Sequence, residues 1–176
     1  MKFKANNITD LIKTFETVDK KLEKQSKEIK ITVLGGASVL LLGMRDRTTV
    51  DIDVASTDDA DAFQKICSEI GITVDIITMA STVDLVHCKT INVFRGAKLI
   101  VDSVTPKDLL KLKLERFYKQ DPEDIYAIIH HEKILFDDFQ NITREMIPDF
   151  IGNPLQLKTS AQVVVEQLWP DKKLIF

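Results

Sequence analysis

The sequence is poor in the residues that build disulfide frameworks, zinc sites and membrane spans. Its 176 residues include only two cysteines, three histidines and one tryptophan. The two cysteines, Cys67 and Cys88, are too few for a disulfide framework or a zinc site. The longest apolar stretch, residues 31–44, is interrupted by Gly35 and Gly36 and is too short to span a bilayer. We therefore expect no contact with a membrane and a cytoplasmic location.

The remaining composition is that of one folded domain. The chain is 44% hydrophobic and 29% charged, which at this length suffices for a substantial core. Residues 1–11 lack the apolar segment of a secretory signal peptide. The net charge of −3 argues against a broad nucleic-acid-binding surface, although it leaves room for a local basic patch. We expect a single domain over residues 1–176, with a core at about 31–130 and C-terminal helices at about 131–176.

Hydrophobic periodicity predicts helices and strands that alternate over the first two-thirds of the chain. Strands are predicted for residues 29–36, 49–55 and 72–79, and a hairpin for residues 91–104. A helix follows the candidate N-cap Asn7, and others are predicted for 37–44, 57–71, 105–119, 121–131, 138–151 and 159–169. This order predicts an α/β (α+β) fold, with a mixed β-sheet, flanking helices and a helical C-terminal part.

Two carboxylates fall in one predicted strand, "TVDIDVA". Side chains in a strand alternate between faces, so Asp51 and Asp53 share one face while Val50, Ile52 and Val54 point into the core. Two like charges this close repel each other and favour a cation between them. Mg²⁺ is commonly held by one or two carboxylates together with substrate phosphates. The alternative is an exposed edge strand whose polar face is acidic without a bound metal.

A glycine pair lies one strand upstream of these aspartates. Gly35 and Gly36 join a predicted strand to a predicted helix, where backbone N–H groups at the positive end of a helix bind phosphate. Ser38 adds a hydroxyl group in the first turn. A glycine pair alone usually marks only a tight turn. Followed by a carboxylate pair, it predicts a phosphate site beside a metal site.

A third carboxylate is expected if two metal ions are held for phosphoryl transfer. Asp75 is the preferred candidate, because it lies between apolar residues in the middle of a predicted strand. The alternative is that Asp75 lies in an edge strand, has its hydrogen bonds satisfied and binds no metal. Asp102 and Asp84 are weaker rivals for the same role.

Together these motifs resemble the signature of the polymerase-β-like nucleotidyltransferase superfamily. The residues that carry the resemblance are "LGGAS" followed by "VDIDV", and Arg47 with Thr48 or Thr49 just before the aspartates. Within the superfamily, the sequence most resembles small bacterial and archaeal proteins that include the toxin subunits of abortive-infection toxin–antitoxin pairs. A second block, "TPKDLLKLKLERFYKQDPEDIYAII", is similar to their Pro-x-Asp-Leu helix with a lysine and a later Asp-x-x-Asp-Ile. Fourteen residues (37–50) separate Gly36 from Asp51, slightly more than is usual, and Gly36 replaces the commoner serine.

The resemblance implies a set of site residues. Mg²⁺ (or Mn²⁺) would be bound by Asp51, Asp53 and Asp75, which are also the catalytic residues. The nucleotide phosphates would contact Gly35, Gly36, Ser38, Arg47 and Lys113. Lys113 shares one helix face with Arg116 and, less closely, with Lys119. The alternative to phosphate binding is that this face is simply exposed to solvent. Asp121 and Asp124 are also explained as a helix cap and a first-turn acid.

The implied reaction moves a nucleoside monophosphate from a nucleoside triphosphate to a hydroxyl group, with pyrophosphate leaving. The acceptor is an RNA 3′ end, a protein or a small molecule, and the sequence does not choose among them. The resemblance further implies a toxin with an antitoxin protein as its partner. The alternative is a catalytically inactive member of the fold that binds a nucleotide or a partner protein.

Overall fold

In a computed structural model, the chain divides into two compact units. The structure describes residues 3–23, 28–117 and 121–176. The first unit comprises Met1–Met79 and Leu85–Thr105, and the second comprises Ala80–Asp84 and Pro106–Phe176. The sequence predicted a single domain with a core at about 31–130 and C-terminal helices at about 131–176, and this division stays a prediction. The second unit begins at Pro106, where the sequence also predicted a helix, and it takes in the short segment 80–84.

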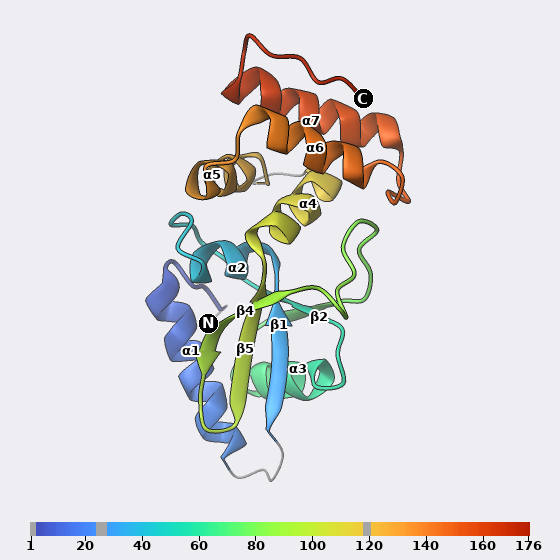
Figure 1. Ribbon diagram of the computed structural model, residues 1–176. Helices are drawn as coiled ribbons and strands as arrows, with labels where there is room; N and C mark the ends of the chain where they lie inside the picture. Colours follow the sequence, from blue (N-terminus) through green and yellow to red (C-terminus); the bar gives the residue numbers. More distant parts are fainter. Residues whose placement is uncertain (1–2, 24–27, 118–120) are drawn as a thin grey trace. The chain divides into compact units, whose positions relative to one another are not determined.

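The first unit contains a five-stranded mixed sheet (Figure 1). Its strands are β1 (Ile29–Val33), β2 (Ile52–Ala55), β3 (Val74–Ile77), β4 (Thr90–Arg95) and β5 (Leu99–Val104). They lie in the order β3-β2-β1-β5-β4. The central strand β1 is antiparallel to β2 and parallel to β5, while β3 is parallel to β2 and β4 is antiparallel to β5. The predicted mixed sheet and the predicted hairpin are confirmed.

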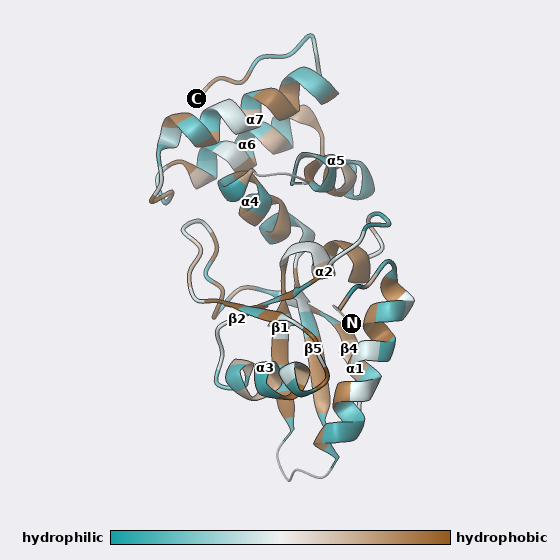
Figure 2. Ribbon diagram, turned by 180° about the vertical axis from the view of Figure 1, so that it is seen from behind, coloured by the Kyte–Doolittle hydropathy of each residue, from teal (hydrophilic) through white to brown (hydrophobic). Residues whose placement is uncertain are grey.

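Helices cover one face of this sheet. The helices of the first unit are α1 (Ile8–Leu22), α2 (Gly35–Leu41) and α3 (Ala60–Glu69). Helices α1 and α3 lie on the same side of the strands and turn their hydrophilic faces outward (Figure 2). The residues beneath them form the core of the unit, including Ile31, Val33, Ile52, Val54 and Val101. Alternate residues of the same strands therefore point to the other face of the sheet.

Asp19 of α1 fastens this helix to the β4–β5 turn. Its carboxylate accepts hydrogen bonds from the backbone N–H groups of Ala97 (2.9 Å), Lys98 (2.7 Å) and Leu99 (2.8 Å). A Cβ atom on Gly96 would overlap the same carboxylate, so glycine is needed there. Burial raises the pKa of Asp19, but the three backbone hydrogen bonds lower it by more, and the pKa lies below its usual value.

The second unit is helical over its described residues. It contains α4 (Pro106–Arg116), α5 (Asp121–Glu132), α6 (Phe136–Met146) and α7 (Pro154–Leu168). Helix α4 contacts the other three, and α7 contacts both α5 and α6. Glu115 of α4 accepts hydrogen bonds from the backbone N–H (2.6 Å) and the hydroxyl group of Thr82, which explains why segment 80–84 belongs to this unit.

The last residues of the chain lie against α6 and α7. Leu174 is buried, and the backbone N–H and C=O groups of Ile175 bind Gln140 of α6 (2.9 Å) and Arg144 of α6 (2.8 Å). The ammonium group of Lys158 on α7 lies 4.9 Å from the ring centre of Phe176. Among the described residues, no helix combines the length and apolar character that crossing a membrane requires.

Candidate functional site

Two of the three predicted metal ligands are direct neighbours in the sheet. Asp53 of β2 is paired with Asp75 of β3 in a parallel register. Paired residues of adjacent strands lie about 5 Å apart and point to the same face. Asp53 is half-buried and Asp75 is exposed, so their carboxylates are adjacent on a face that water reaches.

This face is the one that α1 and α3 leave uncovered. Val33 of β1 is paired with both Val54 and Ser103, so these three residues share the core face. Asp53 and Asp102, each one position away from a paired residue, therefore lie on the opposite face. The carboxylates of β2, β3 and β5 consequently belong to a single sheet surface.

Gly35 brings the glycine junction into contact with Asp53. The φ angle of Gly35 is +63°, a conformation that residues with a Cβ atom rarely adopt. A Cβ atom on Gly35 would also overlap Oδ2 of Asp53. The backbone N–H of Leu34 donates to the carbonyl of Asp53 at 3.0 Å, which holds the junction and the strand together. Glycine is thus required at position 35 both for its backbone angle and for the approach of the carboxylate.

The guanidinium group of Arg47 lies against Gly36, just as the carboxylate of Asp53 lies against Gly35. A Cβ atom on Gly36 would lie 2.8 Å from Cζ and 2.9 Å from Nη2 of Arg47. The guanidinium group of Arg47 and the carboxylate of Asp53 therefore lie against two successive glycines. The structure brings together four predicted residues, Gly35, Gly36, Arg47 and Asp53, with Asp75 on the next strand.

Asp51 lies outside the strand in which it was predicted. Strand β2 begins at Ile52, and Val50 is 57% exposed, so the expectation that Val50 points into the core is wrong. The cause is an isolated antiparallel bridge between Thr49 and Ala5, after which the chain bends before β2. The hydroxyl of Thr49 bonds the carbonyl (2.9 Å) and Oδ1 (3.3 Å) of Asp51. Asp51 is thus oriented by a side-chain contact, and its metal role stays a prediction.

Ser38 has a partner within the protein. Its side chain is fully buried, and its Oγ donates a hydrogen bond to the carbonyl of Val33 at 2.9 Å. This bond satisfies the last carbonyl of β1 as the chain turns into α2. In this arrangement the hydroxyl serves the strand–helix junction, and a contact to phosphate stays a prediction.

Lys113 is the centre of a buried ion cluster in the second unit. Its side chain is 2% exposed, and Nζ lies 2.8 Å from both Oδ1 of Asp121 and Oδ2 of Asp124. Arg116 donates two further bonds of 2.9 Å to Asp121. The cluster joins α4 to α5 and balances two cations with two carboxylates. The sequence placed Lys113 and Arg116 on one helix face, for either phosphate binding or ordinary solvation, and neither reading indicated that Lys113 is buried. Lys119 lies outside the described residues.

Asp102, the rival candidate for the third carboxylate, is enclosed by polar side chains. It is 5% exposed and accepts hydrogen bonds from Thr90 Oγ1 (3.0 Å) and Asn92 Nδ2 (2.9 Å), while Lys30 Nζ lies 3.0 Å from its Oδ2. Burial raises the pKa of Asp102, but Asn92, Lys30 and Thr90 together lower it below its usual value. We call these four residues the Asp102 cluster. The sequence singled out Asp102 but not its three partners, which come from β1 and β4.

We call the sheet surface that α1 and α3 leave uncovered the open face. Its carboxylates could supply some, but not all, of the ligands of a magnesium ion. The Asp53–Asp75 pair supplies the one or two carboxylates that Mg²⁺ usually takes from a protein. Among the described residues, no group of three or more His, Cys, Asp and Glu side chains is arranged to hold a metal ion. A complete shell at this pair would therefore need further oxygen ligands, such as the phosphates of a substrate or water.

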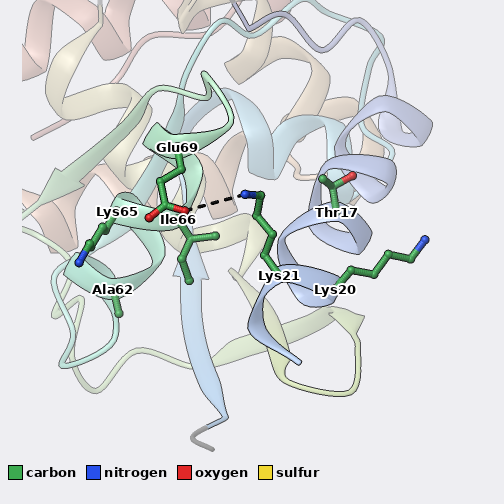
Figure 3. Close-up of a pocket in the computed structure, with 7 residues that line it drawn as sticks. All are labelled: Thr17, Lys20, Lys21, Ala62, Lys65, Ile66 and Glu69. Carbon is green, nitrogen blue, oxygen red and sulfur yellow. Dashed lines mark ion pairs between the residues drawn. The ribbon is translucent and has the colours of Figure 1, made fainter. Parts of the chain in front are cut away.

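A groove of about 700 Å³ lies elsewhere on the first unit (Figure 3). It is formed by α1 and α3, and Lys21 Nζ lies 3.8 Å from Glu69 Oε2 across it. Because α1 and α3 cover the opposite face of the sheet, this groove is separate from the aspartate pair.

Most of the chain matches a known protein family. Residues 9–153 match the family described as a nucleotidyltransferase of unknown function (DUF6036). The chain belongs to this family. No curated protein and no solved structure matches the chain.

The family match covers every residue of the candidate site. It extends from α1 to Asn153, the N-cap of α7, and so includes both the aspartate pair and the ion cluster of Lys113. Helix α7 and the C-terminal residues lie beyond it. Membership in the nucleotidyltransferases, predicted from the glycine and aspartate motifs, is confirmed.

Proposed function

We propose that the chain is a metal-dependent nucleotidyltransferase whose reaction centre is the Asp53–Asp75 pair. The observation that carries the proposal is the register that sets these two carboxylates side by side next to Gly35. Neither a tight turn nor a solvated edge strand requires a carboxylate to lie against a glycine with positive φ. A reaction centre that must bring carboxylates close to bound phosphates accounts for this contact.

In this proposal, Asp53 and Asp75 would hold Mg²⁺ or Mn²⁺. Asp51, at the entrance to β2, would become an additional ligand only by moving toward this pair, because the described structure does not group the three carboxylates. The ion would neutralise the charge of the triphosphate. Arg47 binds a phosphate oxygen, and the backbone at Gly35 and Gly36 lets the phosphates approach closely. The acceptor hydroxyl attacks the α-phosphorus, the bond to the bridging oxygen breaks, and pyrophosphate leaves with the electron pair. Asp75, the more exposed carboxylate, accepts the hydroxyl proton.

The test is calorimetric binding of each nucleoside triphosphate with and without Mg²⁺. We expect Asp53→Asn and Asp75→Asn to abolish the Mg²⁺-dependent part of binding. Asp61→Asn is the matched control, because it removes one exposed carboxylate from α3 on the other side of the sheet. Unchanged binding in Asp53→Asn would contradict the proposal. The nucleoside triphosphate that binds in this experiment is then used in turnover assays with RNA, protein and small-molecule acceptors.

A second candidate function is a nucleotide- or partner-binding module without catalysis. It is favoured by the contacts of Ser38 and Lys113, because both predicted phosphate ligands already have partners within the protein. This function predicts a stable complex with a partner protein and no turnover of any nucleotide.

The toxin role and an antitoxin partner are proposed from the sequence resemblance alone. Expression of the wild-type chain should then arrest cell growth, and the Asp53→Asn variant should not. Growth arrest by both the wild-type chain and the Asp53→Asn variant would show that toxicity does not depend on nucleotidyl transfer.

A further inference from the structure

We infer that the Asp102 cluster is the subsite for the nucleoside part of the triphosphate, which would set its base and sugar preference. This inference rests on the proposed function. It assigns the four residues Lys30, Thr90, Asn92 and Asp102, which the phosphate and metal chemistry does not use.

The first support is position. Asp102 lies on the same open face of the sheet as Asp53, two strands away, because β1 separates β2 from β5. Two strand spacings correspond to about 10 Å. A nucleoside triphosphate held by its phosphates at Asp53 is long enough to reach across β1 to this cluster.

The second support is charge. The cluster pairs one ammonium group with one carboxylate and is neutral as a whole, whereas Arg47 supplies positive charge at the glycine junction. A neutral polar surface suits a ribose or a base better than a phosphate. The two parts of the open face therefore match the two parts of a nucleotide.

The third support is the build of the cluster. Asp102 is 5% exposed and fixes three side chains from two neighbouring strands, so the groups around it have defined positions. The side chain of Lys30 remains 59% exposed, and Thr90 and Asn92 are exposed as well. These three exposed residues carry an ammonium group, a hydroxyl group and a side-chain amide. Hydrogen bonds of this kind discriminate strongly between substrates that do and do not satisfy them.

The experiment compares the tightest-binding nucleoside triphosphate with inorganic tripolyphosphate, both with Mg²⁺. For the wild type we expect the nucleotide to bind at least about tenfold more tightly, the contribution of one or two hydrogen bonds. Thr90→Val and Lys30→Gln should each reduce this ratio severalfold and leave the tripolyphosphate Kd unchanged. Lys89→Gln, which removes an exposed lysine outside the cluster, should change neither value. Circular dichroism checks that each variant is folded.

Three outcomes would overturn the inference. Equal binding of nucleotide and tripolyphosphate by the wild type would remove the subsite but leave the proposed function intact. A loss of tripolyphosphate binding in Lys30→Gln would assign the cluster to phosphate instead. Absence of any binding that depends on Asp53 would overturn the proposed function together with the subsite.

Discussion

Gly35 and Asp53 are in contact at the junction of β1 and α2, at a place where a single added carbon would overlap the carboxylate. The contact joins the glycine motif to the aspartate motif, which are separated by 17 intervening residues (36–52) in the sequence. The position of the Asp53 carboxylate therefore depends on the absence of a side chain at residue 35.

Gly35→Ala is therefore expected to abolish Mg²⁺-dependent nucleotide binding, because the new Cβ displaces Asp53. Gly43→Ala is the matched control: its φ is +67°, but a Cβ atom there meets nothing within 4 Å. Gly43→Ala should lose about 1 kcal/mol of unfolding free energy from the left-handed backbone conformation, and Gly35→Ala should lose more, because its Cβ also overlaps the carboxylate of Asp53. Calorimetry and urea denaturation measure the two effects. Equal nucleotide affinities in the two variants would contradict a binding role for the Gly35–Asp53 contact.

Arg47→Gln should weaken triphosphate binding about tenfold, because it replaces a charge-assisted hydrogen bond to phosphate. Gly36→Ala should have a similar effect with little loss of stability, since its Cβ would meet only the far end of the long Arg47 side chain, 2.8 Å from Cζ. Arg95→Gln, an exposed arginine on β4, is the control for the change in charge. A normal Kd in Arg47→Gln would remove this residue from the site.

Asp19→Asn should lower the unfolding free energy at pH 7 by about 2–4 kcal/mol, because it weakens three charge-assisted hydrogen bonds. The folded-state pKa of Asp19 is lowered, so its stabilising effect is present above the ordinary Asp pKa, near 4, and disappears as the pH falls through the lower folded value. Urea denaturation between pH 7 and pH 3 should therefore show a smaller acid loss for the variant than for the wild type. Glu16→Gln, which changes an exposed carboxylate of the same helix, should behave like wild type.

Lys113→Met should lower the unfolding free energy by about 3–5 kcal/mol, because it leaves Asp121 and Asp124 buried without their shared cation. Lys107→Met on the same helix breaks only the exposed pair with Glu145 and should cost no more than about 1 kcal/mol. Thermal denaturation gives the comparison. Nucleotide affinity of the folded Lys113→Met variant should be unchanged; a tenfold loss would instead support the phosphate role that the resemblance implies.

Local signals predicted most of the elements. Asn7 caps α1 through its side chain, Pro106 begins α4, and Gly71 follows α3 with a φ of +76°. Each of these signals acts within a few residues of its own position. Alternation likewise predicted that Ile52 and Val54 are buried in β2.

The failures arise from contacts between distant segments. The bridge between Ala5 and Thr49 delays the start of β2, and no local pattern indicates it. The three partners of Asp19 lie 78–80 residues away, so a single acid in a helix gives no sign of its role. Lys113 was interpreted through helix periodicity, but the packing of α5 against α4 decides its environment. The pairing of Asp53 with Asp75 also required the strand order, which periodicity does not supply.

The central place of β1 has a consequence during synthesis on the ribosome. Its two neighbours are made later, β2 at residues 52–55 and β5 only at residues 99–104. A nascent chain that has reached Met79 holds β1, β2 and β3 but exposes an apolar strand edge on β1. Such edges pair with other chains. Translation that stalls between β3 and β5 should therefore yield an insoluble fragment, and chaperones are expected to bind the growing chain in this interval.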